Sequence, residues 1–369
     1  MNAHSWITYF NADQSPWLFC VIGPNCRKRM DHWRILFVST LLGVVTQLGW
    51  AQQTEPILPQ LNRVEWTYTT QQMVISNTEI TAEGWDTLAS IRFWKSIMQL
   101  EPELSILNVA KTRQILEKVD SKPWLKQDDA TKEAYRDSLR QYYCLDNDAR
   151  IFLTTGKSDF YNFEKALPAI DRGVAVFIHE QTDPWYAQSI LLIESPGRLE
   201  KSPVGALGSF QLMRGVARQM GLTVNKYQDD RKDFDKSAVG AARLLRTICI
   251  PETRKLLDRH QISYCEDDLW FRLLVLHVYH AGAANVSGVL KVIDPDEGGM
   301  QLIQTLWVTE SGRFRNASQN YSQVALASLL CLEELIARRC IDVCDYPTIP
   351  VAVPPVKPPE TDENTLATE

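Results

Sequence analysis

Basic residues are fewer than acidic residues in this sequence. Lysine and arginine together number 39 against 45 aspartate and glutamate residues, so the formal net charge is −6 and the isoelectric point is about 5.6. A nucleic-acid partner held mainly by charge is therefore not expected, because such proteins carry a basic surface. Hydrophobic residues make up 45% and charged residues 23% of the 369 positions, a globular composition that allows one large domain or two ordinary ones.

Long hydrophobic runs are also absent. The apolar stretch at residues 35–48 is 14 residues long, whereas roughly 20 are needed to span a bilayer, so no stable membrane anchor is expected. A basic segment at residues 27–34 precedes it, and the small residues Gly49 and Ala51 follow it, a pattern typical of a secretory signal peptide. We therefore expect residues 1–51 to be an upstream extension plus signal peptide, with the true start at Met30 and cleavage after Ala51. The residue directly after the expected cleavage point at Ala51 is not a cysteine, which argues against a lipid anchor and predicts an exported, periplasmic protein.

Cysteine is scarce, and two of the eight cysteines precede the apolar stretch. An even number in an oxidising compartment predicts disulfides. Cys249 with Cys265 is the first pair to consider, because both flank the turn-rich link between two expected helices. Sequence alone leaves the connectivity open. A zinc site is the alternative, but no histidine lies near these cysteines at ligand spacing. The six cysteines of the segment expected to be exported are Cys144, Cys249, Cys265, Cys331, Cys340 and Cys344.

The spacing of apolar residues predicts an all-α, mainly helical protein with no repeat of fixed period. Residues 52–175 are expected to be a mostly helical N-terminal region whose role the sequence does not indicate. Residues 176–335 are expected to form a helical domain with glycines at the helix junctions. Residues 336–369 are rich in proline and acids, which is typical of an extended tail.

Within the N-terminal region, the helical period extends from residue 81 to about residue 142. The stretch "SILNVAKTRQILEKV" at residues 105–119 is included as a helix. Short strands are the alternative at "RIFLTT" (residues 150–155) and "GVAVFI" (residues 173–178).

The stretch "LLIESPGRLEKSPVGALGSFQLM", residues 191–213, places Glu194 directly after three large aliphatic residues and before a glycine-rich loop. Burial among Leu191, Leu192 and Ile193 should raise the pKa of Glu194 and keep a proton available. Glycines in the loop allow a close approach to the backbone or a positive φ. The alternative for Glu194 is a helix-end carboxylate that points to solvent.

Four short motifs occur in this half of the chain, in a fixed order. They are "IES" at 193–195, "SPVGALGSFQLM" at 202–213, "DDRKD" at 229–233 and "VYHAG" at 278–282. In this order they resemble the transglycosylase SLT domain of lytic transglycosylases, a family with a lysozyme-like helical fold. The resemblance spans about residues 182–335, and the motif at 202–213 is its most specific part.

The resemblance implies cleavage of the β-1,4 bond between N-acetylmuramic acid and N-acetylglucosamine in peptidoglycan. It implies a reaction without water that leaves a 1,6-anhydromuramic end, with Glu194 as the single acid and base. Two-carboxylate glycosidases work differently, and no obvious second acid accompanies Glu194 here. The residues that the resemblance assigns to substrate binding are Ser195, Ser202, Gly208, Gln211, Met213, Tyr279 and His280.

Four of these residues also have a plainer interpretation. Ser195 is a hydroxyl at a helix end, Ser202 a turn residue before a proline, Met213 a core side chain and Tyr279 an aromatic in a packed helix. Asp230, Arg231 and Asp233 look structural, capping and bridging the next helix.

The chain departs from the family pattern at three points. Ser202 stands eight residues after Glu194, one fewer than usual, Gly197 replaces an aromatic residue, and His280 replaces an asparagine. These differences bear on substrate preference, and on sugar stacking in particular.

Two further functions stay open from the sequence. One is a muramidase, which would admit water and yield reducing ends, and the other is a peptidoglycan-binding protein with a degenerate cleft. No cofactor and no metal is expected, since His277 and His280 lack a third ligand and are interpreted as ordinary helix histidines. The expected partner is the glycan strand of peptidoglycan.

Overall fold

Helices make up most of the computed structural model, which describes residues 61–65, 71–195, 202 and 204–344. The predicted signal peptide and the tail beyond residue 344 lie outside the described residues. The helices are α1 (Thr78–Ala82), α2 (Ala89–Gln99), α3 (Ser121–Lys126), α4 (Asp129–Tyr142), α5 (Phe163–His179), α6 (Trp185–Glu194), α7 (Arg214–Gln219), α8 (Phe234–Leu244), α9 (Ile250–Arg259), α10 (Leu269–Ala281), α11 (Ala283–Ile293), α12 (Met300–Val308) and α13 (Asn316–Cys344). Shorter turns of helix are η1 (Trp85–Thr87), η2 (Asp230–Lys232) and the π-helical η3 (Leu245–Cys249).

In the described part of the chain, five strands form two antiparallel sheets. Strands β1 (Leu61–Glu65) and β2 (Gln71–Ile75) make a hairpin. Strands β3 (Leu104–Val109), β4 (Ile115–Asp120) and β5 (Ile151–Thr155) make a three-stranded sheet in the order β4–β3–β5. The prediction of a strand at residues 150–155 is confirmed by β5, whereas residues 173–178 belong to α5.

The predicted helix over residues 105–119 is wrong, because this stretch forms β3, a tight connection and β4. Strand β3 is the central strand and is buried from Ser105 to Val109. A strand buried on both faces loses the alternation of apolar and polar residues that would distinguish it from a helix.

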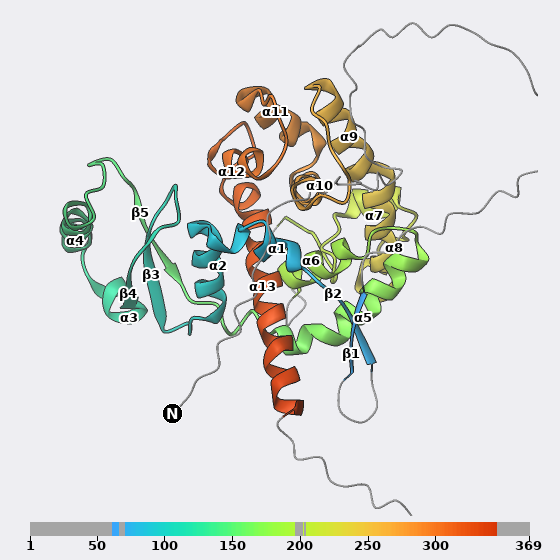
Figure 1. Cartoon of the computed structure of the whole chain (residues 1–369), viewed down its shortest axis with the longest axis horizontal. Coiled ribbons are helices and arrows are strands. Elements are labelled where there is room, and N and C mark those ends of the chain that lie inside the picture. The colour runs from blue at the N-terminus through green and yellow to red at the C-terminus, as the bar shows by residue number, and fades with distance from the viewer. Residues whose placement is uncertain (1–60, 66–70, 196–201, 203, 345–369) are drawn as a thin grey trace, which may run out of the picture.

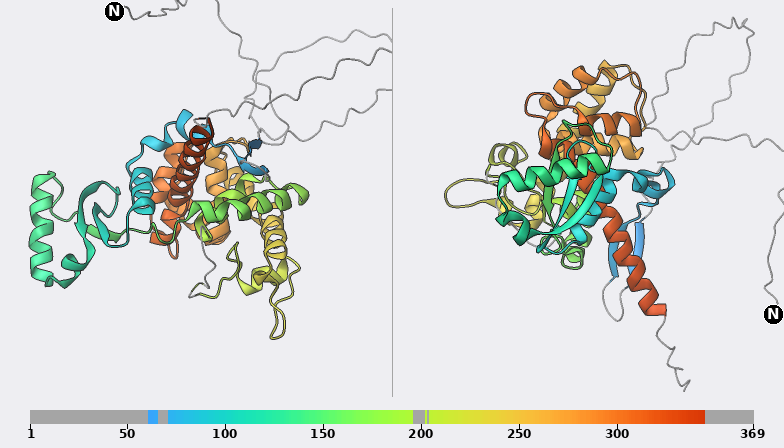
Figure 2. Two further views of the ribbon diagram at one scale, coloured as in Figure 1. Left: turned by 90° about the horizontal axis from the view of Figure 1, so that it is seen from below. Right: turned by 90° about the vertical axis from the view of Figure 1, so that its left-hand side faces the viewer.

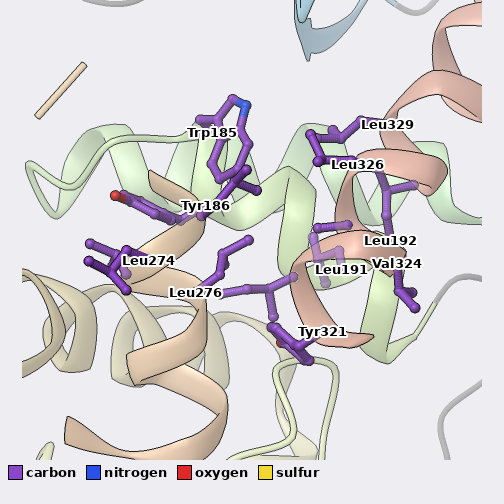
Figure 3. Packing of buried hydrophobic residues seen from close by; sticks show 14 of the residues in the cluster. Trp185, Tyr186, Leu191, Leu192, Leu274, Leu276, Tyr321, Val324, Leu326 and Leu329 are labelled. Carbon is purple, nitrogen blue, oxygen red and sulfur yellow. The ribbon is translucent and has the colours of Figure 1, made fainter. Parts of the chain in front are cut away.

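Two helices, α6 and α10, are buried on nearly all sides. Residues Trp185–Leu192 of α6 and Leu269–Val278 of α10 are all buried. A helix that is apolar all round belongs in the middle of a core. Side chains of α6, α10 and α13 meet in one cluster, with Leu191 and Leu192 facing Val324 and Tyr321 (Figure 3).

The division of the chain at residue 175 is wrong, because one core crosses it. This core contains Val74, Trp85 and Phe93 from the N-terminal region together with side chains as far along the chain as Leu332. We call residues 71–100 and 157–344 the helical body. The predicted end at residue 335 is also too early, since α13 continues to Cys344.

Residues 104–155 form a separate unit, the α/β module, which contains the three-stranded sheet, α3 and α4. Its own small core consists of Leu107, Val109, Leu116, Trp124, Leu139 and Ile151. Neighbouring residues of β3 point to opposite faces, so Ile106 packs in the main core while Leu107 packs in the module. The module projects from the side of the helical body next to α2 (Figures 1 and 2).

Two further expectations concern cysteines and membranes. Cys249 is a free thiol in the main core, so the predicted disulfide between Cys249 and Cys265 is not formed. Burial raises the pKa of the Cys249 thiol to about 12 and keeps it protonated. Of the helices that the structure describes, none is both long and apolar enough to cross a bilayer.

Candidate active site

Glu194 is the last residue of α6 and is partly exposed, although Leu191 and Leu192 before it are fully buried. Desolvation raises the pKa of its carboxyl from 4.5 to about 7. The direction predicted from the three preceding aliphatic residues is therefore confirmed. Near neutral pH a large fraction of Glu194 carries a proton that it can donate.

Tyr321 of α13 is the direct partner of this carboxyl. Its hydroxyl donates a hydrogen bond of 2.9 Å to Glu194 Oε1, and this bond lowers the pKa of Glu194 against the larger effect of burial. Burial also raises the pKa of Tyr321 well above its usual range, so the hydroxyl keeps its proton and stays a donor. Sequence reasoning missed Tyr321, because it lies 127 residues from Glu194 in an apolar helix with no motif around it.

Other aromatic side chains surround the pair. The His280 ring stacks on the Tyr321 ring, with centroids 4.3 Å apart and planes 21° apart. Burial raises the pKa of both Tyr161 and Tyr279, and the nearby charge of Glu194 raises it further by a smaller amount. The Tyr279 hydroxyl donates to the carbonyl oxygen of Phe210 at 2.6 Å, so it anchors the glycine loop rather than contacting the acid.

The glycine loop is held against the next part of the chain. Gly208 has φ +87°, and a Cβ there would lie 1.9 Å from the carbonyl oxygen of Arg231. The positive φ expected of this glycine is therefore confirmed, and the close approach that Gly208 permits in the structure is that of the Arg231 backbone. Gly205 has φ +92° and no atom within 4 Å of a Cβ position.

The other predicted substrate residues lie along this loop. The Ser195 hydroxyl donates to the carbonyl oxygen of Ser209 at 3.1 Å, so it ties α6 to the loop and does not bond the Glu194 carboxyl. Ser202 forms a turn in which its hydroxyl accepts from the Val204 amide at 3.2 Å.

Gln211 and Met213 follow at the far end of the loop. Gln211 has φ +46° and donates through Nε2 to the carbonyl oxygen of Gly208 at 3.0 Å. The Met213 side chain is 44% exposed, so it is not the core residue of the plainer interpretation.

Arg231 fixes the position of the loop. Its Nη1 donates to the carbonyl oxygens of Gly205 and Leu212, both at 2.9 Å, and its Nη2 pairs with Asp229 at 2.7 Å. Asp233 caps α8 by accepting from the Lys236 amide at 3.0 Å. Asp230 accepts from the Thr223 amide and from Lys236, both at 2.8 Å, so the capping and bridging contacts predicted for Asp230, Arg231 and Asp233 are confirmed.

The histidines of α10 do not form a metal site with their neighbours. His277 Nε2 lies 2.8 Å from the Ser322 hydroxyl, and burial lowers the pKa of His277 to about 3. In the described ranges no three histidine, cysteine, aspartate or glutamate side chains gather closely enough to hold a metal ion. Among the described residues, the groups around this position are the carboxyl of Glu194, aromatic side chains and the backbone of the glycine loop.

No family model, curated protein or solved structure matches this chain.

Replacing Gly208 with alanine should destabilise the protein by at least about 2 kcal/mol, because it combines a left-handed φ with a clash against backbone. Gly205→Ala is the matched control, since it shares the positive φ but meets no atom, and it should cost about 1 kcal/mol. Urea unfolding of the two variants compares the free energies. Equal losses would contradict the close contact with Arg231.

The raised pKa of Glu194 predicts that stability depends on pH. Between the ordinary value of 4.5 and the folded value of about 7, the folded chain holds a proton that the unfolded chain has lost. The stabilisation is therefore complete below 4.5 and disappears as the pH rises through 7. One pKa unit corresponds to about 1.4 kcal/mol. As the pH rises from below 4.5 to above 7, the free energy of unfolding of the unmodified chain should therefore fall by about 3 kcal/mol more than that of Glu194→Gln. Parallel stability curves from urea unfolding would show that the carboxyl is not desolvated.

Tyr321→Phe should raise the pKa of Glu194 by about one unit, since it removes a hydrogen bond to the charged form while keeping the ring on His280. Tyr279→Phe is the control, because its hydroxyl bonds a carbonyl oxygen instead of the carboxyl. Carbon-13 NMR of the labelled glutamate carboxyl follows both titrations. A shift of equal size in the two variants would contradict the assignment of Tyr321 as the direct partner.

Proposed function

We propose that this chain is an exported peptidoglycan lytic transglycosylase with Glu194 as its single acid and base. The observation that carries the proposal is the position of the Glu194 carboxyl, at the end of a buried helix and beside the glycine loop, where burial raises its pKa to about 7. An acid of this kind is suited to protonating the oxygen of a glycosidic bond near neutral pH. The motif order around Glu194 supplies the substrate class, the glycan strand of peptidoglycan.

The reaction would proceed in two proton transfers through one residue. Glu194 first donates its proton to the oxygen that leaves with N-acetylglucosamine, and the C1–O4 bond of N-acetylmuramic acid breaks. The carboxylate then takes the proton of the C6 hydroxyl, whose oxygen bonds to C1 and closes the 1,6-anhydro ring. No water is consumed, and the proton that Glu194 gives to the leaving oxygen is replaced by the proton of the C6 hydroxyl.

The surroundings of Glu194 favour a single acid. In the part of the chain that the structure describes, burial and Tyr321 account for its pKa, and no second carboxylate contributes. Hydrolytic glycosidases place two carboxylates a few ångströms apart, one of which activates water or attacks the sugar. Tyr321 stabilises the carboxylate that exists between the two proton transfers, which makes it a positioning residue for this chemistry.

Two loop residues are suited to contact the sugar. Met213 is exposed at the start of α7, and Gln211 stands at the end of the glycine loop. Ser195 and Gly208 have roles in holding the loop, so they act on the substrate only through its shape.

The test uses purified protein, isolated sacculi and mass spectrometry of the released muropeptides. We expect products about one water lighter than hydrolytic ones, and a loss of at least about 100-fold in their rate of release for Glu194→Gln. Glu252→Gln, which removes a surface acid paired with Lys255, is the control and should keep full activity.

Other outcomes would change the assignment. Reducing ends would identify a muramidase that uses the same acid. Unchanged release by Glu194→Gln would remove Glu194 from the mechanism. Absence of release by folded protein would favour the peptidoglycan-binding alternative.

A further inference from the structure

A cleft of about 930 Å³ lies where the α/β module meets the helical body. One wall comes from the connection between β3 and β4 and from the segment between α4 and β5. The other wall comes from the end of α12 and the first turns of α13. Figure 1 shows the module on the side of the helical body where α2, α12 and α13 lie. None of the residues assigned to the proposed catalytic reaction lines this cleft.

Charged side chains of both signs line the cleft without pairing. The basic ones are Lys111, Arg113, Arg150 and Arg315, and the acidic ones are Asp146, Asp148 and Glu310. Elsewhere on the described surface such charges do pair, for example Arg254 with Glu266 and Arg172 with Asp235. Within the described residues, none of the seven side chains in the cleft forms an ion pair. A wall with separate positive and negative side chains is complementary to a ligand that carries both positive and negative charges.

Arg113 is the most informative of these residues, because it is buried, with 8% of its surface exposed. Its guanidinium lies over the rings of Phe93, Trp94 and Phe152 at 5.5, 5.7 and 6.0 Å. These rings orient the guanidinium plane, and cation–π contact offsets part of its desolvation.

The hydrogen bonds of Arg113 leave most of its donors unused by protein. One nitrogen, Nη2, donates to the side-chain oxygens of Asn316 and Asn320, at 3.4 and 3.2 Å. A guanidinium has five N–H donors, and among the described residues no carboxylate balances its charge. A buried charge without a counter-ion is costly, so a carboxylate from a ligand would bind it strongly. The residue also adopts a left-handed φ of 60°, a strained conformation for a side chain of this size.

The cleft also offers apolar surface. Phe152 and Val308 line it and are 39% and 43% exposed. Together, the charges of both signs and these apolar patches suit a short peptide that has carboxylates, an amine and small apolar side chains.

We propose that this cleft binds a zwitterionic peptide, with Arg113 receiving one of its carboxylates. If the proposed function holds, on which this part of the inference rests, the peptide is the stem attached to the glycan strand that Glu194 cleaves. Helix α13 separates the two sites: Asn316 and Asn320 face the cleft, while Tyr321 contacts Glu194.

The test is isothermal titration calorimetry with the full chain carrying Glu194→Gln, so that no turnover occurs. The probes are a stem tetrapeptide of alanine, D-glutamate, diaminopimelate and D-alanine, the same peptide with its carboxyls amidated, and chitotetraose as a glycan without peptide. We expect the acid tetrapeptide to bind and the amidated one to bind at least about tenfold more weakly, because each charge-assisted hydrogen bond contributes about a factor of ten.

The location is tested by two charge-reversal pairs. Lys111→Glu with Arg315→Glu changes two side chains that line the cleft, one from the module and one from the helical body, and should weaken tetrapeptide binding at least tenfold. Lys126→Glu with Arg313→Glu is the matched control, since both are exposed, come from the same two parts and lie outside the cleft lining. It should leave binding unchanged, and neither pair should alter chitotetraose binding. Circular dichroism confirms that both variants are folded.

Three results would overturn the inference. The first is that the tetrapeptide does not bind to the folded chain. The second is that both charge-reversal pairs bind the tetrapeptide with equal affinity. The third is that inorganic phosphate binds as tightly as the tetrapeptide, which would indicate a simple anion site. Sacculus cleavage is measured separately with the chain that retains Glu194. Peptide binding without cleavage would therefore refute the proposed function alone, and cleavage without peptide binding would refute this inference alone.

Discussion

The desolvated carboxyl of Glu194 is the constraint on which the arrangement of the helical body depends. A carboxyl keeps a pKa near 7 only if the helix that carries it is closed off from water, and α6 is enclosed by elements from distant parts of the chain. Gln188 exchanges two hydrogen bonds of 2.9 Å with the backbone of Ile75 in β2, and Trp185 donates to Asn77 at 2.9 Å. The N-terminal segment is thus part of the wall around α6, which explains why one core crosses the predicted domain boundary.

A second buried group, the guanidinium of Arg231, organises the surface beside the acid. It bonds two loop carbonyl oxygens, and its own carbonyl oxygen occupies the space that a side chain at Gly208 would need. A buried arginine that satisfies backbone carbonyls holds a loop without any regular secondary structure. The glycine-rich sequence is therefore explained by packing between two backbone segments, and the sugar would meet the loop through exposed groups such as Met213.

Much of the helical body could be predicted from the sequence, and so could the acid. The three aliphatic residues before Glu194 indicate that the end of this helix is buried, which is sufficient to predict the direction of the pKa shift, although distant elements provide the burial. Tyr321 could not be predicted, since its contact with Glu194 joins positions 127 residues apart. The strands β3 and β4 were missed for a different reason: a buried central strand and a polar connection imitate the apolar spacing of a helix. The predicted boundary at residue 175 was wrong because nothing in the sequence around Trp85 and Phe93 indicates which core these side chains pack in.

Helix α13 links the two sites through its geometry. Asn316, Gln319, Asn320 and Gln323 recur at intervals of three and four, which places them on one side of the helix, towards the cleft. Tyr321 lies about 140° around the axis from Asn316 at 100° per residue, so it points to the other side, where it meets Glu194. Residues 318–332 of this helix are all buried except Asn320, which is half-buried. A rotation of α13 that improved the contacts at the cleft would therefore weaken the contact between Tyr321 and Glu194. The same packing of α13 thus determines both the pKa of Glu194 and the shape of the cleft.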